Sequence, residues 1–206
     1  MTKSLVVNCS LKTKSEALVE ALRKFSECQV IQYSDLKEGY RVEAGIDAVV
    51  ISGSGARIVD PSHRRPFDGV VDLLKTCDLP ILGICFGHQL LCWAFNAKVG
   101  SLAQPVLDLF EAVCVGDANG LFAGFKENQT VPLAENHYDY VLKASLNQAS
   151  FVLLADSDSC EVEAVKYKNK PFYGVQFHPE RIKLKGESHS EGHRVIENFY
   201  DNVVKR

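Results

Sequence analysis

The stretch Leu82-Gly83-Ile84-Cys85-Phe86-Gly87-His88-Gln89-Leu90-Leu91 decides the fold prediction, because it places a cysteine between two glycines at the junction of two apolar runs. Residues 79–84 predict a short buried strand, and residues 88–95 predict an apolar helix. Glycine at 83 and 87 lets the strand and helix backbones approach closely around one residue. This pattern predicts a nucleophile elbow with Cys85 at its tip. Taken alone, it also fits a cysteine buried in a core strand.

Strand-like and helix-like patterns alternate through the first half of the chain. Short apolar or β-branched runs at 5–9, 29–33, 48–52 and 81–85 predict strands, and apolar stripes at 15–25 and 67–74 predict helices. This alternation predicts an α/β fold with an open, mostly parallel sheet and helices on both faces. Ligands of such sheets bind beyond the carboxyl ends of the strands, where Cys85 is expected.

The second half has few helix-like stripes between its strand-like runs. Runs at 110–115, 151–155, 162–167 and 171–177 predict a mixed or antiparallel extension of the sheet, and residues 191–204 predict a final amphipathic helix. A chain of 206 residues suits one domain with a large core, so we expect a single domain over residues 1–206.

Composition and charge narrow the possible functions. The net charge of -3 gives no electrostatic reason to expect nucleic-acid or membrane binding. No apolar run approaches the ~18 residues of a membrane span, and the start lacks the apolar run of a signal peptide. Seven cysteines without a CxxC pair predict reduced thiols and a cytoplasmic location. No close Cys/His pairing recurs at ligand spacing, so the sequence predicts no metal site.

A cysteine nucleophile needs a base that a third group orients. The segment Tyr173-Gly174-Val175-Gln176-Phe177-His178-Pro179-Glu180 offers both at the end of a predicted strand. There His178 leaves the sheet, and Glu180 can accept a hydrogen bond from one nitrogen of its ring. The amide of Phe86, the residue after the cysteine, is expected to stabilise an oxyanion. The sequence therefore predicts a catalytic triad of Cys85, His178 and Glu180.

Both motifs resemble those of the class I glutamine amidotransferases, whose Cys-His-Glu triad occurs in segments like 83–89 and 174–180. The resemblance covers essentially the whole chain and implies a flavodoxin-like fold. It also implies that Cys85 attacks the side-chain amide of L-glutamine, forms a glutamyl thioester and releases ammonia. His178 would protonate the departing ammonia and then activate water, while Glu180 orients the ring. No cofactor is implied.

A third segment, Ile51-Ser52-Gly53-Ser54-Gly55-Ala56, follows a predicted strand where the family places its glycine-rich oxyanion loop. Gly53 and Ser54 are therefore predicted, with Phe86, to line the oxyanion site. Many family members have glycine where this chain has Ser54, and a side chain there restricts the peptide rotation that aims an amide at the oxyanion. A plain strand-to-loop turn is the alternative interpretation.

The segment Glu135-Asn136-His137-Tyr138-Asp139-Tyr140-Val141 resembles the Ser-His-x-Asp-x-Val element of GMP synthetase glutaminase domains, with asparagine in place of the usual serine. The resemblance implies that the backbone of Asn136, His137 and Tyr138 binds the α-groups of glutamine. Gln89, one turn into the elbow helix, is predicted to contact the same end of the substrate. The stretch Val162-Glu163-Ala164-Val165 resembles the same branch of the family.

The sequence contains neither a phosphate-binding Gly-x-x-x-x-Gly-Lys loop nor a Ser-Gly-Gly-x-Asp-Ser pyrophosphatase loop. We therefore expect a glutaminase subunit that passes ammonia to a separate ATP-dependent synthetase in a transient heterodimer. The resemblance points to GMP synthetase, which converts XMP to GMP. Two alternatives stay open: a γ-glutamyl peptide hydrolase of the same fold, and a regulatory or binding homologue without turnover. Ser54 and the diverged start Asn8-Cys9-Ser10 are hints of the latter.

Overall fold

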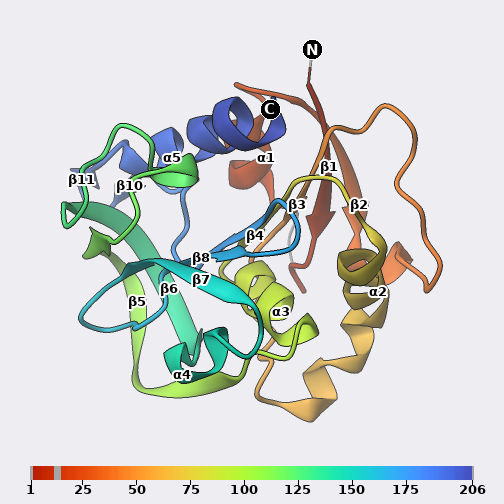
Figure 1. Ribbon diagram of the computed structural model, residues 1–206, viewed down its shortest axis with the longest axis horizontal. Helices are drawn as coiled ribbons and strands as arrows, with labels where there is room; N and C mark the ends of the chain where they lie inside the picture. The colour runs from red at the N-terminus through yellow and green to blue at the C-terminus, as the bar shows by residue number, and fades with distance from the viewer. Residues whose placement is uncertain (1, 12–14, 206) are drawn as a thin grey trace.

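The computed structural model describes residues 2–11 and 15–205. Within them, a nine-stranded sheet with the order β2-β1-β3-β4-β9-β8-β7-β5-β6 runs through the molecule (Figure 1). The strands are β1 (Lys3–Asn8), β2 (Glu27–Gln32), β3 (Ala48–Ile51), β4 (Ile81–Ile84), β5 (Val99–Val115), β6 (Thr130–Val141), β7 (Phe151–Asp156), β8 (Ala164–Tyr167) and β9 (Phe172–Val175). A small hairpin of β10 (Lys183–Leu184) and β11 (Glu187–Ser188) forms a separate two-stranded sheet.

The helices flank the sheet. They are α1 (Glu16–Leu22), α2 (Asp68–Thr76), α3 (Phe86–Ala94), α4 (Lys143–Leu146) and α5 (Glu191–Phe199), which continues into a π-helical turn over Tyr200–Val204. Short 3-10 turns occur at Tyr33–Asp35, Pro61–His63, Arg65–Phe67 and Gly120–Phe122. None of the helices in the described parts of the chain is both long and apolar enough to cross a membrane.

The sheet changes character along its width. Strands β2, β1, β3, β4 and β9 pair in parallel, whereas β9, β8, β7, β5 and β6 pair antiparallel. The predicted mostly parallel sheet with an antiparallel extension in the C-terminal half is therefore confirmed. β9, from the C-terminal half of the chain, pairs with β4 in the sheet. The segment that follows β9, with His178 and Glu180, therefore lies next to Cys85, which follows β4.

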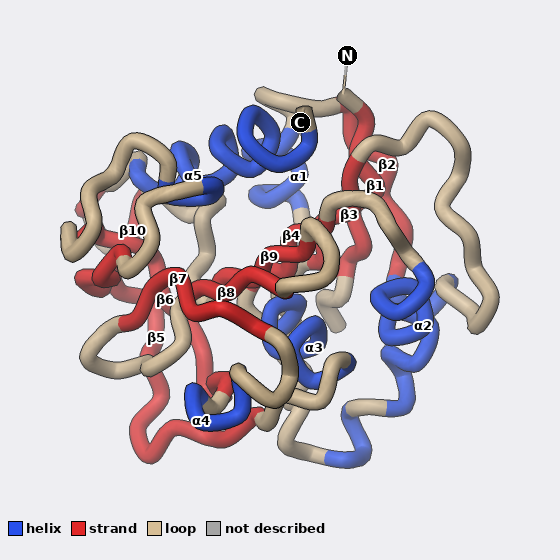
Figure 2. Tube along the Cα trace, in the orientation of Figure 1, coloured by secondary structure: helices blue, strands red, loops and turns tan. Residues whose placement is uncertain are grey.

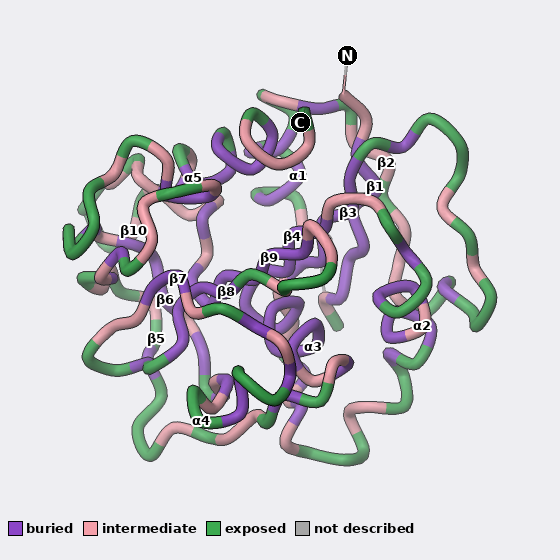
Figure 3. Tube along the Cα trace, in the orientation of Figure 1, coloured by how far each residue is buried: buried purple, intermediate pink, exposed green. Residues whose placement is uncertain are grey.

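Two cores lie on opposite faces of the sheet. On β1, Leu5 and Val7 pack into the core under α2 and α3, while Val6 between them packs into the core under α1 and α5. Figure 2 shows these helices on both sides of the sheet, and Figure 3 shows the buried residues concentrated along its strands. Such a strand is apolar on both faces, which is why β1, β3 and β4 read as continuous apolar runs in the sequence.

Two parts of the C-terminal half differ from the prediction. β5 spans Val99–Val115, whereas residues 110–115 were expected, and β6 was not predicted as a strand. In the first part of β5, apolar and polar residues do not alternate regularly and several side chains are exposed, so its sequence gives only a weak strand signal. β6 buries the polar side chains of Glu135, His137 and Asp139, which reverses the usual apolar signal of a core strand.

Candidate active site

Cys85 lies at the junction of β4 and α3 in a left-handed backbone conformation, with φ of 49° and ψ of -105°. Few residues other than glycine adopt this region, and strain of this kind gathers at functional sites. A Cβ on Gly83 would lie 2.6 Å from the carbonyl oxygen of Gly87, and one on Gly87 would collide with the backbone of Ile51. The glycines are therefore required by close backbone packing, as the elbow pattern predicts.

His178 and Glu180 meet Cys85 at this corner of the sheet. Nδ1 of His178 lies 2.8 Å from Oε1 of Glu180, and both side chains are largely buried. The amide of His178 donates to the carbonyl of Ala134 at 2.7 Å, which ties the imidazole segment to β6. The amide of Cys85 donates to the carbonyl of Val175 at 2.8 Å, so the elbow is tied to β9. The structure thus brings together the three residues that the sequence predicts as a triad.

The charges around His178 favour its protonated form. Burial lowers its pKa, but the charge of Glu180, with further contributions from Cys85, raises the pKa of His178 to about 10. For Glu180, burial raises the pKa, but the neighbouring imidazolium outweighs it and the net shift is downward. Glu180 is therefore a carboxylate at neutral pH, and His178 can hold a proton between that carboxylate and the sulfur of Cys85.

The predicted oxyanion loop faces the same corner. A Cβ on Gly53 would lie 3.1 Å from Cε1 of His178 and 3.6 Å from Cβ of Cys85, so the loop backbone passes directly over the two side chains. The hydroxyl of Ser54 accepts a hydrogen bond from the amide of Ala56 at 3.0 Å. Ser54 is not among the residues with positive φ. The side chain of Ser54 is therefore compatible with the observed loop conformation, and its hydroxyl oxygen points back into the turn.

A cavity of about 920 Å³ opens beside the corner. Its walls come from the loop after β1, the loop after β3, the start of α3, β6 and the segment after β9, and they include the residues predicted to bind substrate: Gln89, Asn136, His137 and Tyr138. A cavity of this size holds an amino acid with room to spare.

The predicted substrate contacts differ in what they offer the cavity. The carbonyl oxygen of Asn136 lies 3.7 Å from Sγ of Cys85, and Tyr138 is 51% exposed. Gln89 is buried, and its amide nitrogen already donates to the carbonyl of Asp139 at 2.8 Å and to Oε1 of Gln176 at 3.0 Å. The ring of His137 is also buried, with Nδ1 3.0 Å from the carbonyl oxygen of Asp139. The side chains of Gln89 and His137 therefore hydrogen-bond to the backbone of β6, and they present few polar atoms to the cavity.

One ion pair at the cavity was missed from the sequence. Arg57 follows the predicted oxyanion loop, and its guanidinium donates to both carboxylate oxygens of Asp139 on β6. Ser101 on β5 bonds to both partners, at 2.8 Å from Nη2 of Arg57 and 3.0 Å from Oδ1 of Asp139. Asp139 is buried while the arginine is partly exposed. Arg57 and Asp139 are 82 residues apart, so no local sequence pattern predicts their ion pair. It is seen only in the tertiary structure.

The fold and this corner define a class: an α/β protein with a cysteine at a nucleophile elbow and a histidine–glutamate pair beside it. The family model for glutamine amidotransferase class-I matches residues 5–203. The chain belongs to this family.

Relatives agree with this assignment, and a solved structure shares the fold. The chain is 40% identical over 146 residues to a glutamine-hydrolyzing GMP synthase subunit of Methanothermobacter thermautotrophicus, covering 68% of this chain and 69% of that one. The corresponding subunit of Pyrococcus furiosus is 41% identical over 131 residues, 63% of each chain. A crystal structure of a putative GMP synthase subunit from Thermoplasma acidophilum superposes with a TM-score of 0.79 at 24% identity, covering 97% of this chain and 93% of that one. This last likeness concerns the fold.

Proposed function

We propose that the protein hydrolyses the side-chain amide of glutamine through a cysteinyl thioester and supplies the ammonia to a separate synthetase. The observation that carries the proposal is the corner itself: a strained Cys85 at the start of α3, with His178 held by Glu180 at 2.8 Å and the Gly53 loop over both. Membership of the class-I glutamine amidotransferase family supports the choice of glutamine as substrate.

In the first half of the reaction, the Cys85 thiolate attacks the amide carbon of glutamine and the carbonyl oxygen becomes an oxyanion. The amide of Phe86, at the N-terminus of α3, and the backbone of the loop at Gly53 and Ser54 would stabilise that charge. His178 then transfers its proton to the leaving nitrogen, the C–N bond breaks, and ammonia departs. The product on the protein is a γ-glutamyl thioester of Cys85.

In the second half, the now neutral His178 takes a proton from water, and the hydroxide attacks the thioester carbon. Collapse of the second tetrahedral intermediate expels the Cys85 thiolate and releases glutamate. His178 keeps the proton, and Glu180 holds the ring in one orientation through both steps. The imidazolium–thiolate pair is thereby restored.

The proposed acceptor of the ammonia is the ATP-dependent subunit of a GMP synthetase, which aminates XMP to GMP. Support comes from relatives in Methanothermobacter thermautotrophicus, Methanococcus aeolicus and Methanocaldococcus jannaschii, which are named as glutamine-hydrolyzing GMP synthase subunits. We propose a transient heterodimer in the cytoplasm, with the cavity mouth near exposed Tyr138 facing the synthetase.

Covalent labelling tests the mechanism. A diazo-ketone analogue of glutamine should alkylate Cys85, as read by mass spectrometry of the tryptic peptide, alone or with the synthetase present. Cys85→Ala should abolish labelling, while replacement of another buried thiol by Cys77→Ser should not. A chain left unlabelled at Cys85 under both conditions would not be an amidotransferase. Turnover of γ-glutamyl peptides in preference to glutamine would instead favour the peptide hydrolase.

A further inference from the structure

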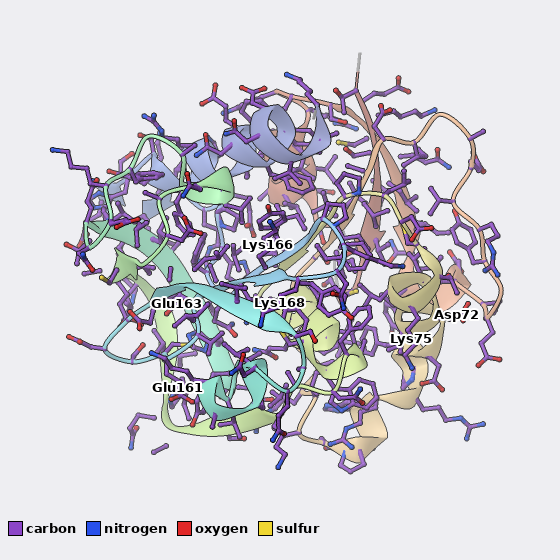
Figure 4. The ribbon with its side chains drawn as sticks, in the orientation of Figure 1. Asp72, Lys75, Glu161, Glu163, Lys166 and Lys168 are labelled. Atoms are coloured by element: carbon purple, nitrogen blue, oxygen red, sulfur yellow. The ribbon has the colours of Figure 1, made fainter. Side chains whose placement is uncertain are left out.

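A second cluster of polar side chains is buried behind the catalytic corner, and the proposed glutaminase mechanism does not use it. It comprises His137 on β6 with Cys160 and Glu163 from the loop that leads into β8, and their ligand-type atoms all lie within 4.8 Å of one another. All three side chains are buried. Figure 4 labels Glu163, which directly precedes β8, and the exposed Lys166 on that strand. A fourth residue, Glu135, is fully buried beside His137.

The imidazole of His137 presents a lone pair to this cluster. Its Nδ1 lies 3.0 Å from the carbonyl oxygen of Asp139, which can only accept, so the proton must be on Nδ1. In this tautomer the ring carries its lone pair on Nε2. In the described chain Nε2 has no hydrogen-bond partner. A histidine whose other nitrogen is fixed by a backbone carbonyl has the arrangement usual for metal ligands.

The carboxyl groups leave further acceptors without donors. Oε1 of Glu163 accepts from the hydroxyl of Ser157 at 2.8 Å. Among the described residues, no other side chain or backbone group donates to its Oε2 or to the oxygens of Glu135, and these two carboxyl groups lie within hydrogen-bond reach of each other. Oε2 of Glu135 lies 3.4 Å from Nε2 of His137 without hydrogen-bond geometry. Two carboxylates at zero exposure are costly unless a positive charge or a shared proton compensates them. The cluster must therefore hold either protons or a cation.

The thiol of Cys160 completes the cluster. It is buried, and it donates to the carbonyl oxygen of Val162 at 3.4 Å. A bound divalent cation favours the ionised form of a thiol or carboxyl ligand.

We propose that His137, Cys160 and Glu163 bind a Zn²⁺ ion, with Glu135 supplying the fourth ligand. One thiolate, one imidazole nitrogen and carboxylate oxygens form a donor set that suits zinc, which takes four such ligands in a tetrahedron. Binding draws the ligand atoms inward, to about 2.3 Å from metal to sulfur and about 2.0–2.2 Å to nitrogen and oxygen. The hydrogen bond from Ser157 to Glu163 then orients a carboxylate ligand.

The metal site would stabilise the position of β6 and would not contact the substrate. The residue between Glu135 and His137 is Asn136, whose carbonyl oxygen lies 3.7 Å from Sγ of Cys85, and Ala134 on the same strand accepts from the amide of His178. A metal that holds both neighbours of Asn136 would fix the strand that faces the triad. The sequence predicted no metal site, because His137 and the other two ligands lie more than twenty residues apart, without the paired spacing of zinc motifs.

Metal analysis of the purified full chain tests the proposal. The chain, purified without chelator from zinc-containing medium, should carry about one zinc per molecule by elemental mass spectrometry. Chelation should lower its melting temperature, and added Zn²⁺ should restore it. Co²⁺ added to the chelated Cys85→Ala variant should give thiolate-to-cobalt absorption, which excludes the catalytic thiol as its source. Ser157→Ala should weaken the zinc affinity by about 10–100-fold.

Cys160→Ser should lose the cobalt band, with Cys92→Ser, another fully buried thiol, as the matched control that keeps it. Should Cys160→Ser fail to fold, the Cys85→Ala spectrum and the chelation series decide the matter. Zinc-free wild-type protein that shows no melting shift with Zn²⁺ and no cobalt band would overturn the proposal and leave a proton shared by Glu135 and Glu163. None of these readouts depends on glutamine hydrolysis, so the glutaminase proposal stands or fails separately.

Discussion

At the scale of single residues, the corner that holds Cys85 depends on the pair of His178 and Glu180. The carboxylate raises the pKa of the imidazole, and the imidazolium lowers that of the carboxylate. The sign of each shift fixes how the pair contributes to stability. For His178, whose folded pKa is raised to about 10, the contribution is full below pH ~6.5 and is lost as the pH rises through about 10. For Glu180, whose folded pKa is lowered, it is present above pH ~4.3 and is lost as the pH falls through the depressed value.

Glu180→Gln should therefore lower the pKa of His178 toward its ordinary value, since the charge that raises this pKa most is gone. The loss of unfolding free energy relative to wild type should be greatest between about pH 5 and 6.5, where both contributions are complete. Urea unfolding at several pH values and NMR titration of the histidine ring measure the two effects. Glu187→Gln, beside the more exposed His189, is the control and should give a nearly flat difference. An unchanged His178 pKa would contradict the pairing.

The elbow glycines make a second prediction at this scale. Gly87→Ala introduces a Cβ that collides with the Ile51 backbone, which a strand in the middle of the sheet cannot move aside. Alanine gains about 1 kcal/mol of helix propensity over glycine, but overpacking costs about 1–3 kcal/mol or more, so a net loss of stability is expected. Gly55→Ala is the matched control, because nothing lies within 4 Å of its Cβ. Urea unfolding that ranks the two variants equally would refute the close approach.

At the scale of elements, Arg57 joins the proposed oxyanion loop to β6 by its bonds to Asp139. Arg57→Met leaves the buried carboxylate with the hydroxyl of Ser101 alone, which should cost about 1–3 kcal/mol of unfolding free energy. Since the loop then loses an anchor, KM for glutamine should rise more than kcat falls. Steady-state kinetics and urea unfolding test both expectations.

The control for this variant is Arg41→Met. Arg41 is also an arginine at the surface, and its guanidinium donates to the carbonyl of neighbouring Tyr40. Its replacement should change stability by no more than about 0.5 kcal/mol and leave KM unaltered. Equal effects at the two positions would show that the pair of Arg57 and Asp139 does not anchor the loop.

The elements differ in how well the sequence predicts them. β1, β3 and β4 are buried on both faces, so their apolar runs were found within a residue or two of their bounds. β6 was missed because Glu135, His137 and Asp139 are buried on it, and a buried polar residue reads like a surface one. The resemblance to the family drew attention to residues 135–141, but only pairing with β5 makes them a strand.

At the scale of the whole molecule, the proposed division of labour makes the glutaminase and the synthetase separable. Cys85→Ala should abolish glutamine-dependent formation of GMP by a mixture with the partner synthetase, because the thioester cannot form. Formation of GMP from added ammonium salt should remain, since that route bypasses this chain. Parallel assays with glutamine and with ammonium measure the two routes. Glutamine-dependent synthesis that survives the substitution would contradict the assignment of Cys85.

The sequence by itself determined the elbow at Cys85, the His178-Pro179-Glu180 turn and the alternating α/β pattern. Each is local, because a strained turn, a strand end or an apolar run depends on neighbours in the chain. Only the tertiary structure decided what those segments face: the insertion of β9 beside β4, the bond between Arg57 and Asp139, and the buried cluster of His137, Cys160 and Glu163. These contacts join residues far apart in sequence. The local sequence around a polar side chain does not predict that the fold will bury it.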